Sequence, residues 1–195
     1  MSITLDYYNQ NASTFYAETI NANLARQYQL FEKYLQPKAH ILDLGCGSGR
    51  DSKYFQDQGY TVTAIDGSRE LCKLARELTG LDVKEMLFQD LAYSHEFDGI
   101  WASASLLHLP KDELLTILEK IAQALKEQGI LYASFKYGRY CGVRQGRYFT
   151  DLDLSALSQL INQVPTLTIL EHEISADVRP KRSKEQWLNV VMRRA

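Results

Sequence analysis

Short apolar segments alternate with amphipathic segments over much of the chain, and this rhythm constrains the fold more than any other feature of the sequence. Five segments have the length and the branched or aromatic residues of buried strands, at residues 40–44, 61–65, 83–88, 98–102 and 130–135. Helices are expected between them over 51–58, 69–79 and 111–127, with Gly129 where a helix C-terminal glycine belongs. Strands that alternate with helices predict a doubly wound α/β fold with a parallel sheet.

The two ends of the chain depart from this rhythm. Residues 6–20 and 24–35 read as two helices, the second of which is stopped by Pro37. Beyond the fifth strand, residues 137–150 read as a loop, 151–161 as a helix, and 167–174 with 187–192 as a hairpin. The prediction is a Rossmann-like sheet of seven strands, mostly parallel with an antiparallel last strand, and helices on both faces. We expect a single domain over 1–195, in which residues 1–36 form an N-terminal helical cap.

Composition narrows the class of protein. The chain has 195 residues, a net charge of −2 and 24% charged residues, as expected of one soluble domain. No apolar run approaches the roughly 18 residues of a membrane helix, and MSITLDYYNQ lacks the features of a signal peptide. We therefore expect a cytoplasmic protein with no membrane partner. Three widely spaced cysteines and four histidines without metal-ligand spacing predict reduced thiols and no metal site.

The first strand ends in a turn with glycine at every second position, Gly45, Gly47 and Gly49. In a doubly wound sheet, ligands bind beyond the carboxyl ends of the strands, where this turn lies. The dinucleotide fingerprint GxGxxG would place its third glycine at Arg50, so the turn does not match it. Its actual pattern is an acid, Asp43, followed by the three glycines.

This pattern resembles the first motif of the class I methyltransferases, which use S-adenosylmethionine. The resemblance runs from about residue 8 to residue 194. It is strongest to small bacterial tellurite-resistance-like methyltransferases, at DLGCGSGRDS, ASLLHLP, SFKYG, GRYFT, DVRP and WLN. It implies a cofactor and a reaction type, and much less about a substrate.

The strand ends supply candidate contacts to that cofactor. Asp66 follows Gly45 by about 20 residues and suits the two ribose hydroxyls, a demand that NAD shares. The resemblance implies that Asp43 meets the ammonium group, directly or through water, and that Asp90 bonds the adenine amino group. Leu91 would pack on the adenine ring. The full predicted set is Tyr8, Tyr16, Asp43, Gly45, Cys46, Gly47, Arg50, Asp66, Gly67, Ser68, Asp90, Leu91 and Ser103.

Three members of this set have a second interpretation. Tyr8 and Tyr16 either close over the methionine part of the cofactor or only pack their helix on the sheet. Arg50 either approaches the cofactor carboxylate or pairs with a nearby acid.

Basic residues gather in two segments that should overhang the same edge of the sheet. Residues 136–150 contain four cations and no acid, and residues 179–185 contain Arg179, Lys181, Arg182 and Lys184 against Glu185. One hypothesis is an anionic small-molecule substrate held by Lys136, Arg147 and Arg179, because the arginine fork suits carboxylate and phosphate. The alternative is a solvated basic rim.

His108 is the one histidine at a strand end that is expected to face the site. It is the candidate catalytic base, or it bonds the substrate. The alternative is that it only shapes the loop before Pro110.

The leading functional prediction is methyl transfer from S-adenosylmethionine to a small anionic molecule. An RNA methyltransferase is an alternative, disfavoured by the pI of about 6.1 and by the lack of an appended RNA-binding domain. A non-catalytic cofactor-binding module is another. The chain lacks the Asn-Pro-Pro-Tyr and Pro-Cys motifs of nucleobase methylation. We expect a monomer or a weak homodimer.

Overall fold

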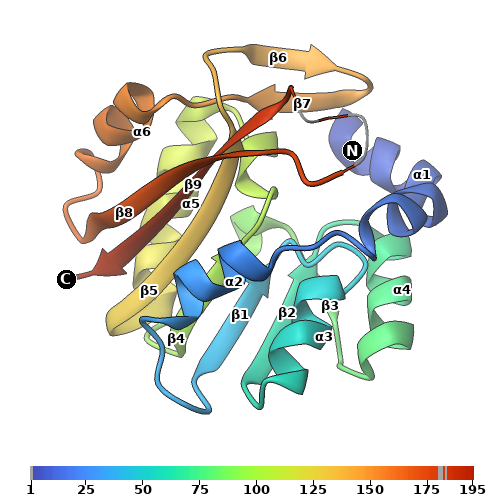
Figure 1. The fold of residues 1–195 in the computed structure, drawn as a ribbon, viewed down its shortest axis with the longest axis horizontal. Coiled ribbons are helices and arrows are strands. Elements are labelled where there is room, and N and C mark those ends of the chain that lie inside the picture. The colour runs from blue at the N-terminus through green and yellow to red at the C-terminus, as the bar shows by residue number, and fades with distance from the viewer. Residues whose placement is uncertain (1, 180–181, 183) are drawn as a thin grey trace.

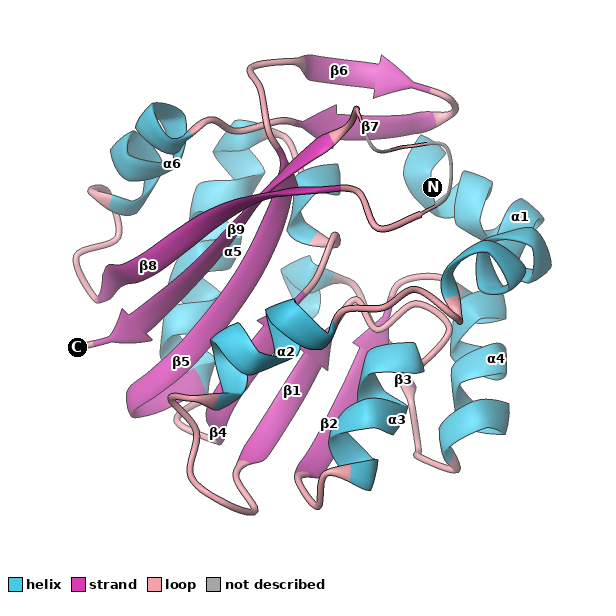
Figure 2. Ribbon diagram, in the orientation of Figure 1, coloured by secondary structure: helices cyan, strands magenta, loops and turns pink. Residues whose placement is uncertain are grey.

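The computed structural model describes residues 2–179, 182 and 184–195, and within these residues seven strands form one sheet flanked by helices (Figures 1 and 2). The strand order is β3-β2-β1-β4-β5-β9-β8. Strand β9 runs antiparallel to both of its neighbours, and the other pairs are parallel. The predicted α/β fold, with its mostly parallel sheet and antiparallel last strand, is confirmed.

The sheet consists of β1 (His40–Leu44), β2 (Thr61–Asp66), β3 (Lys84–Glu85), β4 (Phe97–Ala102), β5 (Leu125–Lys136), β8 (Leu167–Ala176) and β9 (Gln186–Arg194). The helices are α1 (Ile3–Thr19), α2 (Ala25–Glu32), α3 (Arg50–Asp57), α4 (Arg69–Thr79), α5 (Lys111–Ala124) and α6 (Leu154–Ile161). Within the described residues, no helix is both long and apolar enough to span a bilayer.

The two faces of the sheet are covered by different kinds of side chain. Helices α2 and α3 lay an aromatic cluster on one face, in which Tyr28 and Phe55 pack around Trp101 of β4. Helices α5 and α6 cover the other face with aliphatic residues such as Leu118 and Leu157. Both faces of the central strands are therefore dry, which explains their continuous apolar sequences.

Two predicted boundaries were wrong. The third strand, expected over 83–88, is reduced to Lys84–Glu85 at the sheet edge, and a 3₁₀ turn over Phe88–Asp90 follows it. The helix expected to reach residue 127 ends at Ala124, because the fully buried Leu125 leaves it to pair with Phe97 of β4. Gly129 therefore lies inside β5 and does not end the helix.

The segment 137–150, predicted to be a loop, forms a second small sheet of two strands, β6 (Cys141–Arg144) and β7 (Arg147–Thr150). Gln145 and Gly146 join them with left-handed φ angles of 50° and 76°, as a tight hairpin turn requires. Figure 1 shows this hairpin beside α1, above the strand ends of the main sheet. The Tyr148 amide donates a hydrogen bond of 3.0 Å to Thr4 of α1.

A buried carboxylate, Asp51, connects the first turn of α3 to its neighbours. It receives two hydrogen bonds from Arg50, at 2.6 and 3.0 Å. It also accepts from the Tyr28 hydroxyl at 2.6 Å and from the Trp101 indole at 2.9 Å. Arg50 in turn donates to the carbonyl of Thr19 at the end of α1. One carboxylate thereby joins α2, α3 and β4, and through Arg50 it reaches α1.

A second buried carboxylate, Asp43 of β1, lies next to this network. Ser52 donates to it at 2.5 Å. Burial, followed by the charge of Asp51, raises the pKa of Asp43 to about 8. Burial also opposes ionisation of Asp51, but the charge and hydrogen bonds of Arg50 lower the pKa of that group. The pair therefore carries one negative charge, on Asp51, and one proton, on Asp43.

We expect Asp43→Asn to gain stability relative to the wild type as pH rises from 5 to 7. In the wild type, the folded state keeps a proton on Asp43 that the unfolded chain loses near pH 4, so the free energy of unfolding falls as pH rises toward 8. Asparagine has no such proton. The free energy of unfolding of the variant, minus that of the wild type, should therefore increase by roughly 1 kcal/mol per pH unit. Urea denaturation at several pH values measures this difference.

Asp51→Asn is the contrasting variant. It leaves the buried Arg50 guanidinium without its counter-charge, so the free energy of unfolding at pH 7 should fall by roughly 3–5 kcal/mol.

For Asp43→Asn, the contradicting outcome is a free energy of unfolding that changes with pH in the same way as that of the wild type. Such parallel curves would show that Asp43 is not protonated in the folded protein.

Candidate active site

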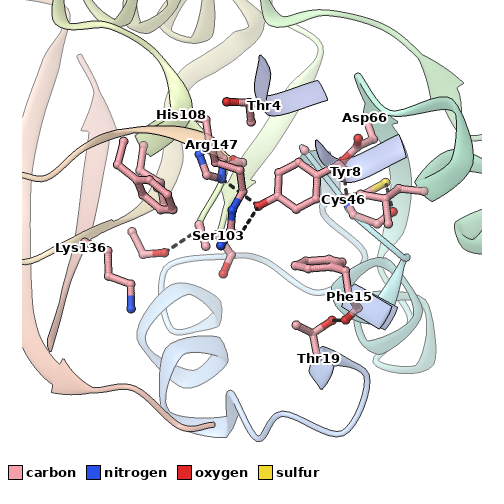
Figure 3. Close-up of a pocket in the computed structure, with 18 of the residues that line it drawn as sticks. Thr4, Tyr8, Phe15, Thr19, Cys46, Asp66, Ser103, His108, Lys136 and Arg147 are labelled. Atoms are coloured by element: carbon pink, nitrogen blue, oxygen red, sulfur yellow. Dashed lines mark hydrogen bonds between the residues drawn. The ribbon is translucent and has the colours of Figure 1, made fainter. Parts of the chain in front are cut away.

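A cavity of about 1340 Å³ lies beyond the carboxyl ends of β1, β2 and β4, beneath α1 and the β6–β7 hairpin (Figure 3). Its volume exceeds the 300–1,000 Å³ typical of a pocket for one small ligand, so it has room for two. Thirteen of the predicted site residues line it: Tyr8, Gly45, Cys46, Gly47, Arg50, Asp66, Gly67, Asp90, Ser103, His108, Lys136, Arg147 and Arg179.

Three predicted cofactor residues from the sheet side lie outside the cavity lining. Asp43 is buried beneath the glycine turn and accepts from Ser52. Ser68 caps the N-terminus of α4, and its hydroxyl is bonded to Asn9 of α1 at 2.8 Å. Leu91 belongs to the hydrophobic core. These three residues lie behind the cavity wall, where their hydrogen bonds and packing hold the lining residues in position.

The predicted pair of tyrosines on α1 does not share one face. Tyr8 lines the cavity, but Phe15 lies there in place of Tyr16. The backbone at Asn11 leaves the helical conformation, with φ −117° and ψ 16°, and this kink changes the register of the second half of α1. The sequence gives no proline or glycine at that point to signal it.

Three backbone amides of the glycine turn donate hydrogen bonds to other groups of the protein. The Gly45 and Cys46 amides both donate to the carbonyl of Ile65, at 3.0 and 2.9 Å. The Gly47 amide donates to Asp66 at 2.8 Å. These three amides of the turn are therefore used within the protein and are not available to a ligand.

Close packing explains the first glycine of the turn. Gly45 has a left-handed φ of 78°, and a Cβ atom there would lie 2.5 Å from the Cβ of Ser105. Ser105 itself donates to the carbonyl of Leu44 at 2.7 Å. The loop after β4 is thereby held against the turn after β1, which brings Ser103 to the cavity.

Asp66 ends β2 at the cavity wall. Its two oxygens accept from the Ser68 amide at 2.7 Å and from the Gly47 amide at 2.8 Å. Burial raises the pKa of Asp66, and these two amides oppose that rise. A carboxylate has about four acceptor positions, so two remain for hydroxyl donors. This arrangement fits a ribose diol. Asp90 lies further along the same wall, with Phe88.

Opposite this wall, three side chains meet beneath the hairpin (Figure 3). The Tyr8 hydroxyl is 2.9 Å from Nε2 of His108. Nη1 of Arg147 lies 3.4 Å from the same hydroxyl. Nδ1 of His108 lies 2.7 Å from the carbonyl oxygen of Tyr148. The groups come from α1, β7 and the 3₁₀ turn Leu106–His108, and together they form a polar cluster in a largely apolar wall.

Two of the predicted substrate anchors are engaged in ion pairs. Lys136 lies 3.0 Å from Asp177 and also pairs with Glu185. Arg179 donates twice to Asp177, at 2.9 and 2.6 Å. Although burial opposes ionisation, the Arg179 hydrogen bonds hold the pKa of Asp177 well below its usual range. The predicted basic rim is therefore largely neutralised. Lys181 lies outside the described residues.

Arg147 differs from its neighbours on the hairpin. Arg144 forms a double hydrogen bond to Asp151, and Arg139 pairs with Asp153. Among the residues that the structure describes, Arg147 pairs with no carboxylate, although it is only 9% exposed. Its guanidinium packs 4.5 Å from the ring centre of Tyr7, and its Nε has no hydrogen-bond partner.

The sequence interpretation missed many residues that line the cavity, among them Asp51 and Phe15. Asp51, which fixes Arg50, had a detectable signal because it is an acid in the first turn of a helix that follows the glycine turn. Phe15, whose ring lies 3.3 Å from where a Cβ of Gly47 would be, had none. For Arg50, the structure shows the pairing with an acid that was one of its two interpretations.

Comparison with known proteins agrees with this geometry. Residues 41–129 match the family model described as a methyltransferase domain. A ubiquinone biosynthesis O-methyltransferase from Xanthomonas campestris pv. campestris is 35% identical over 105 residues, which are 50% of this chain and 43% of that protein. The chain spans about half the length of most of the curated relatives it matches.

Two solved structures have the same fold. One is the 1,6-didemethyltoxoflavin-N1-methyltransferase of Burkholderia thailandensis with bound 1,6-didemethyltoxoflavin and S-adenosylhomocysteine. It has a TM-score of 0.78, 23% identity, and coverage of 98% of this chain and 85% of that one. The other is a TehB-like methyltransferase from Corynebacterium glutamicum, with a TM-score of 0.70, 21% identity and 98% coverage of both chains. The family match identifies a methyltransferase domain over residues 41–129, and the whole chain has the fold of the solved S-adenosylmethionine-dependent class I methyltransferases.

Proposed function

We propose that this protein transfers a methyl group from S-adenosylmethionine to a small anionic molecule. The observation that carries the anionic part is Arg147, a buried cation without a carboxylate partner among the described residues, in the same cavity as the glycine turn. A buried charge is costly unless it is paired, so its partner is expected to arrive with the substrate. The bound heterocycle in the Burkholderia thailandensis structure supports a small-molecule acceptor.

The chain's own residues fit this cofactor. Asp66 has free acceptor positions for the ribose hydroxyls, and in this proposal Asp90, which lines the same cavity, accepts from the adenine amino group. The glycine turn lines the same cavity through Gly45, Cys46 and Gly47. When bound, S-adenosylmethionine supplies an already activated methyl group, so positioning and exclusion of water are the main tasks left to the protein.

The N-terminal cap performs part of that exclusion in our proposal. Residues 1–36 contain α1, which contributes Tyr8 and Phe15 to the cavity and contacts the hairpin through Thr4. Closing the cavity on this side keeps water from the acceptor and strengthens the charge interaction with Arg147. The acceptor would bind between Arg147, Tyr8 and Ser103, beside the methionine end of the cofactor.

A nucleic-acid substrate has less support. Binding of a phosphate backbone needs several free cations, whereas Arg139 and Arg144 of the hairpin segment are each paired with an aspartate.

We expect Asp66→Ala to weaken binding of S-adenosylhomocysteine by roughly 100-fold, because two hydrogen bonds to a buried carboxylate are lost. Isothermal titration calorimetry measures this directly. Asp82→Ala, which removes an exposed acid outside the cavity, is the matched control and should bind as the wild type does. Wild-type binding of NADH without binding of S-adenosylhomocysteine would refute the cofactor assignment.

We expect Arg147→Met to raise the KM of a carboxylate or phosphate acceptor roughly 100-fold, with the Kd of S-adenosylhomocysteine changed less than about twofold. The assay is release of S-adenosylhomocysteine with a panel of small acids and their neutral methyl esters. Arg139→Met removes an exposed, ion-paired arginine of the same segment and serves as the control. An equal preference of the wild-type enzyme for acids and esters would eliminate the anionic substrate.

A further inference from the structure

We infer that Tyr8 and His108 form a proton relay, in which the Tyr8 hydroxyl contacts the acceptor atom and His108 stores the proton that the acceptor loses. This inference rests on the proposed methyl transfer and deepens it. It assigns the catalytic contact to Tyr8 and makes His108 a residue that acts through Tyr8.

The direction of the relay follows from one backbone carbonyl. The oxygen of Tyr148 can only accept a hydrogen bond, and it lies 2.7 Å from Nδ1 of His108. Nδ1 therefore carries the hydrogen of the neutral ring, and Nε2 presents a lone pair. The Tyr8 hydroxyl, 2.9 Å from Nε2, must then be the donor in that contact. Its own oxygen keeps its lone pairs for another donor.

The remaining lone pairs of Tyr8 meet donors from the cavity. Nη1 of Arg147 approaches the Tyr8 oxygen at 3.4 Å, which is long for a hydrogen bond of this kind. Figure 3 shows the Tyr8 hydroxyl between Arg147 and His108, above Ser103. An acceptor molecule whose anionic group binds Arg147 would therefore bring its X–H group next to Tyr8.

The proton balance of the step is simple. The acceptor X–H gives its proton to the Tyr8 oxygen as Tyr8 gives its own proton to Nε2 of His108. The lone pair released on X forms the new bond to the methyl carbon, and the electrons of the broken carbon–sulfur bond remain on sulfur. Tyr8 ends as a neutral phenol and His108 as an imidazolium, which returns its proton to solvent after the product leaves.

The charges around the imidazole couple this step to substrate binding. The groups that act on it are Tyr8 of α1, Arg144 of β6, Arg147 of β7 and the Tyr148 carbonyl. Burial, together with the two arginines, lowers the pKa of His108 to about 4, against the effect of the carbonyl. The ring is thus neutral at pH 7. A substrate anion on Arg147 offsets one of the two cations and makes His108 a stronger base when the acceptor is in place.

The relay narrows the class of acceptor. A thiolate or an oxyanion that is already ionised at neutral pH has no proton to give to Tyr8. An amine or hydroxyl on an anionic molecule does, and such nucleophiles benefit from a general base. The structure therefore favours nitrogen or oxygen methylation of a small acid whose accepting atom is protonated in solution.

Nuclear magnetic resonance of ¹⁵N-histidine-labelled protein tests the geometry without any acceptor. At pH 7 the His108 ring, assigned from its absence in His108→Asn, should be neutral with the hydrogen on Nδ1. Tyr8→Phe should shift the Nε2 resonance, because it removes that hydrogen bond, whereas Tyr16→Phe on the same helix should not. A hydrogen on Nε2, or an imidazolium at pH 7, would overturn the relay.

Kinetics with the best acid from the acceptor panel test its role. Tyr8→Phe should lower kcat at least 100-fold, within the usual range for a general base, while KM and the Kd of S-adenosylhomocysteine change less than about threefold. Tyr16→Phe should retain kcat. If Tyr8→Phe keeps its kcat and only KM rises, Tyr8 merely packs against the substrate and the relay is refuted. Failure of the wild type to bind S-adenosylhomocysteine would refute the proposed function instead.

Discussion

The buried charge of Asp51 is the interaction on which the active-site half of the molecule depends. A carboxylate in the interior is tolerated only when donors surround it, and here those donors come from Arg50, Tyr28 and Trp101. Arg50 precedes Asp51 in α3, whereas Tyr28 of α2 and Trp101 of β4 are 23 and 50 residues away in the sequence and reach Asp51 only when these elements have packed together. Arg50 extends the network to the end of α1. The turn that begins α3 is therefore fixed from three sides before any ligand arrives.

The same requirement, that a buried charge needs hydrogen-bond donors or a counter-charge, explains the other rim of the cavity. Asp177 accepts hydrogen bonds from Arg179, Lys136 and the Trp187 indole. These bonds order the start of the segment between β8 and β9. Asp151 does the same for Arg144 of the hairpin. A rim that looks strongly basic in the sequence is thus mostly self-compensated. Arg147 differs, because it pairs with no carboxylate among the described residues, and our proposal assigns recognition of the acceptor's charge to it.

The features that the sequence predicts well are local ones. Strand cores, the glycine spacing and the acid that ends β2 depend on a few neighbouring residues. The central strands lie where the sequence predicts them, and Gly45, Gly47 and Asp66 line the cavity. The ion pairs could not be predicted in this way, because Lys136 and Asp177 are 41 residues apart. The hairpin was missed because its turn, Gln145–Gly146, has a weak signal and its strands are short. At the kink in α1, the Asn11 side chain donates a hydrogen bond of 2.8 Å to the carbonyl of Tyr7, a contact that the sequence analysis did not predict.

The cavity is lined partly by the central segment of the chain and partly by the segments that flank it. The residues that face the expected cofactor, such as Gly45, Asp66 and Asp90, lie within the segment 41–129 that matches the methyltransferase model. Tyr8 lies before this segment and Arg147 lies after it. Substitutions in the flanking segments can therefore alter which molecule is recognised while the central segment stays unchanged. In such an architecture, new acceptor specificities can evolve without loss of the methyl donor.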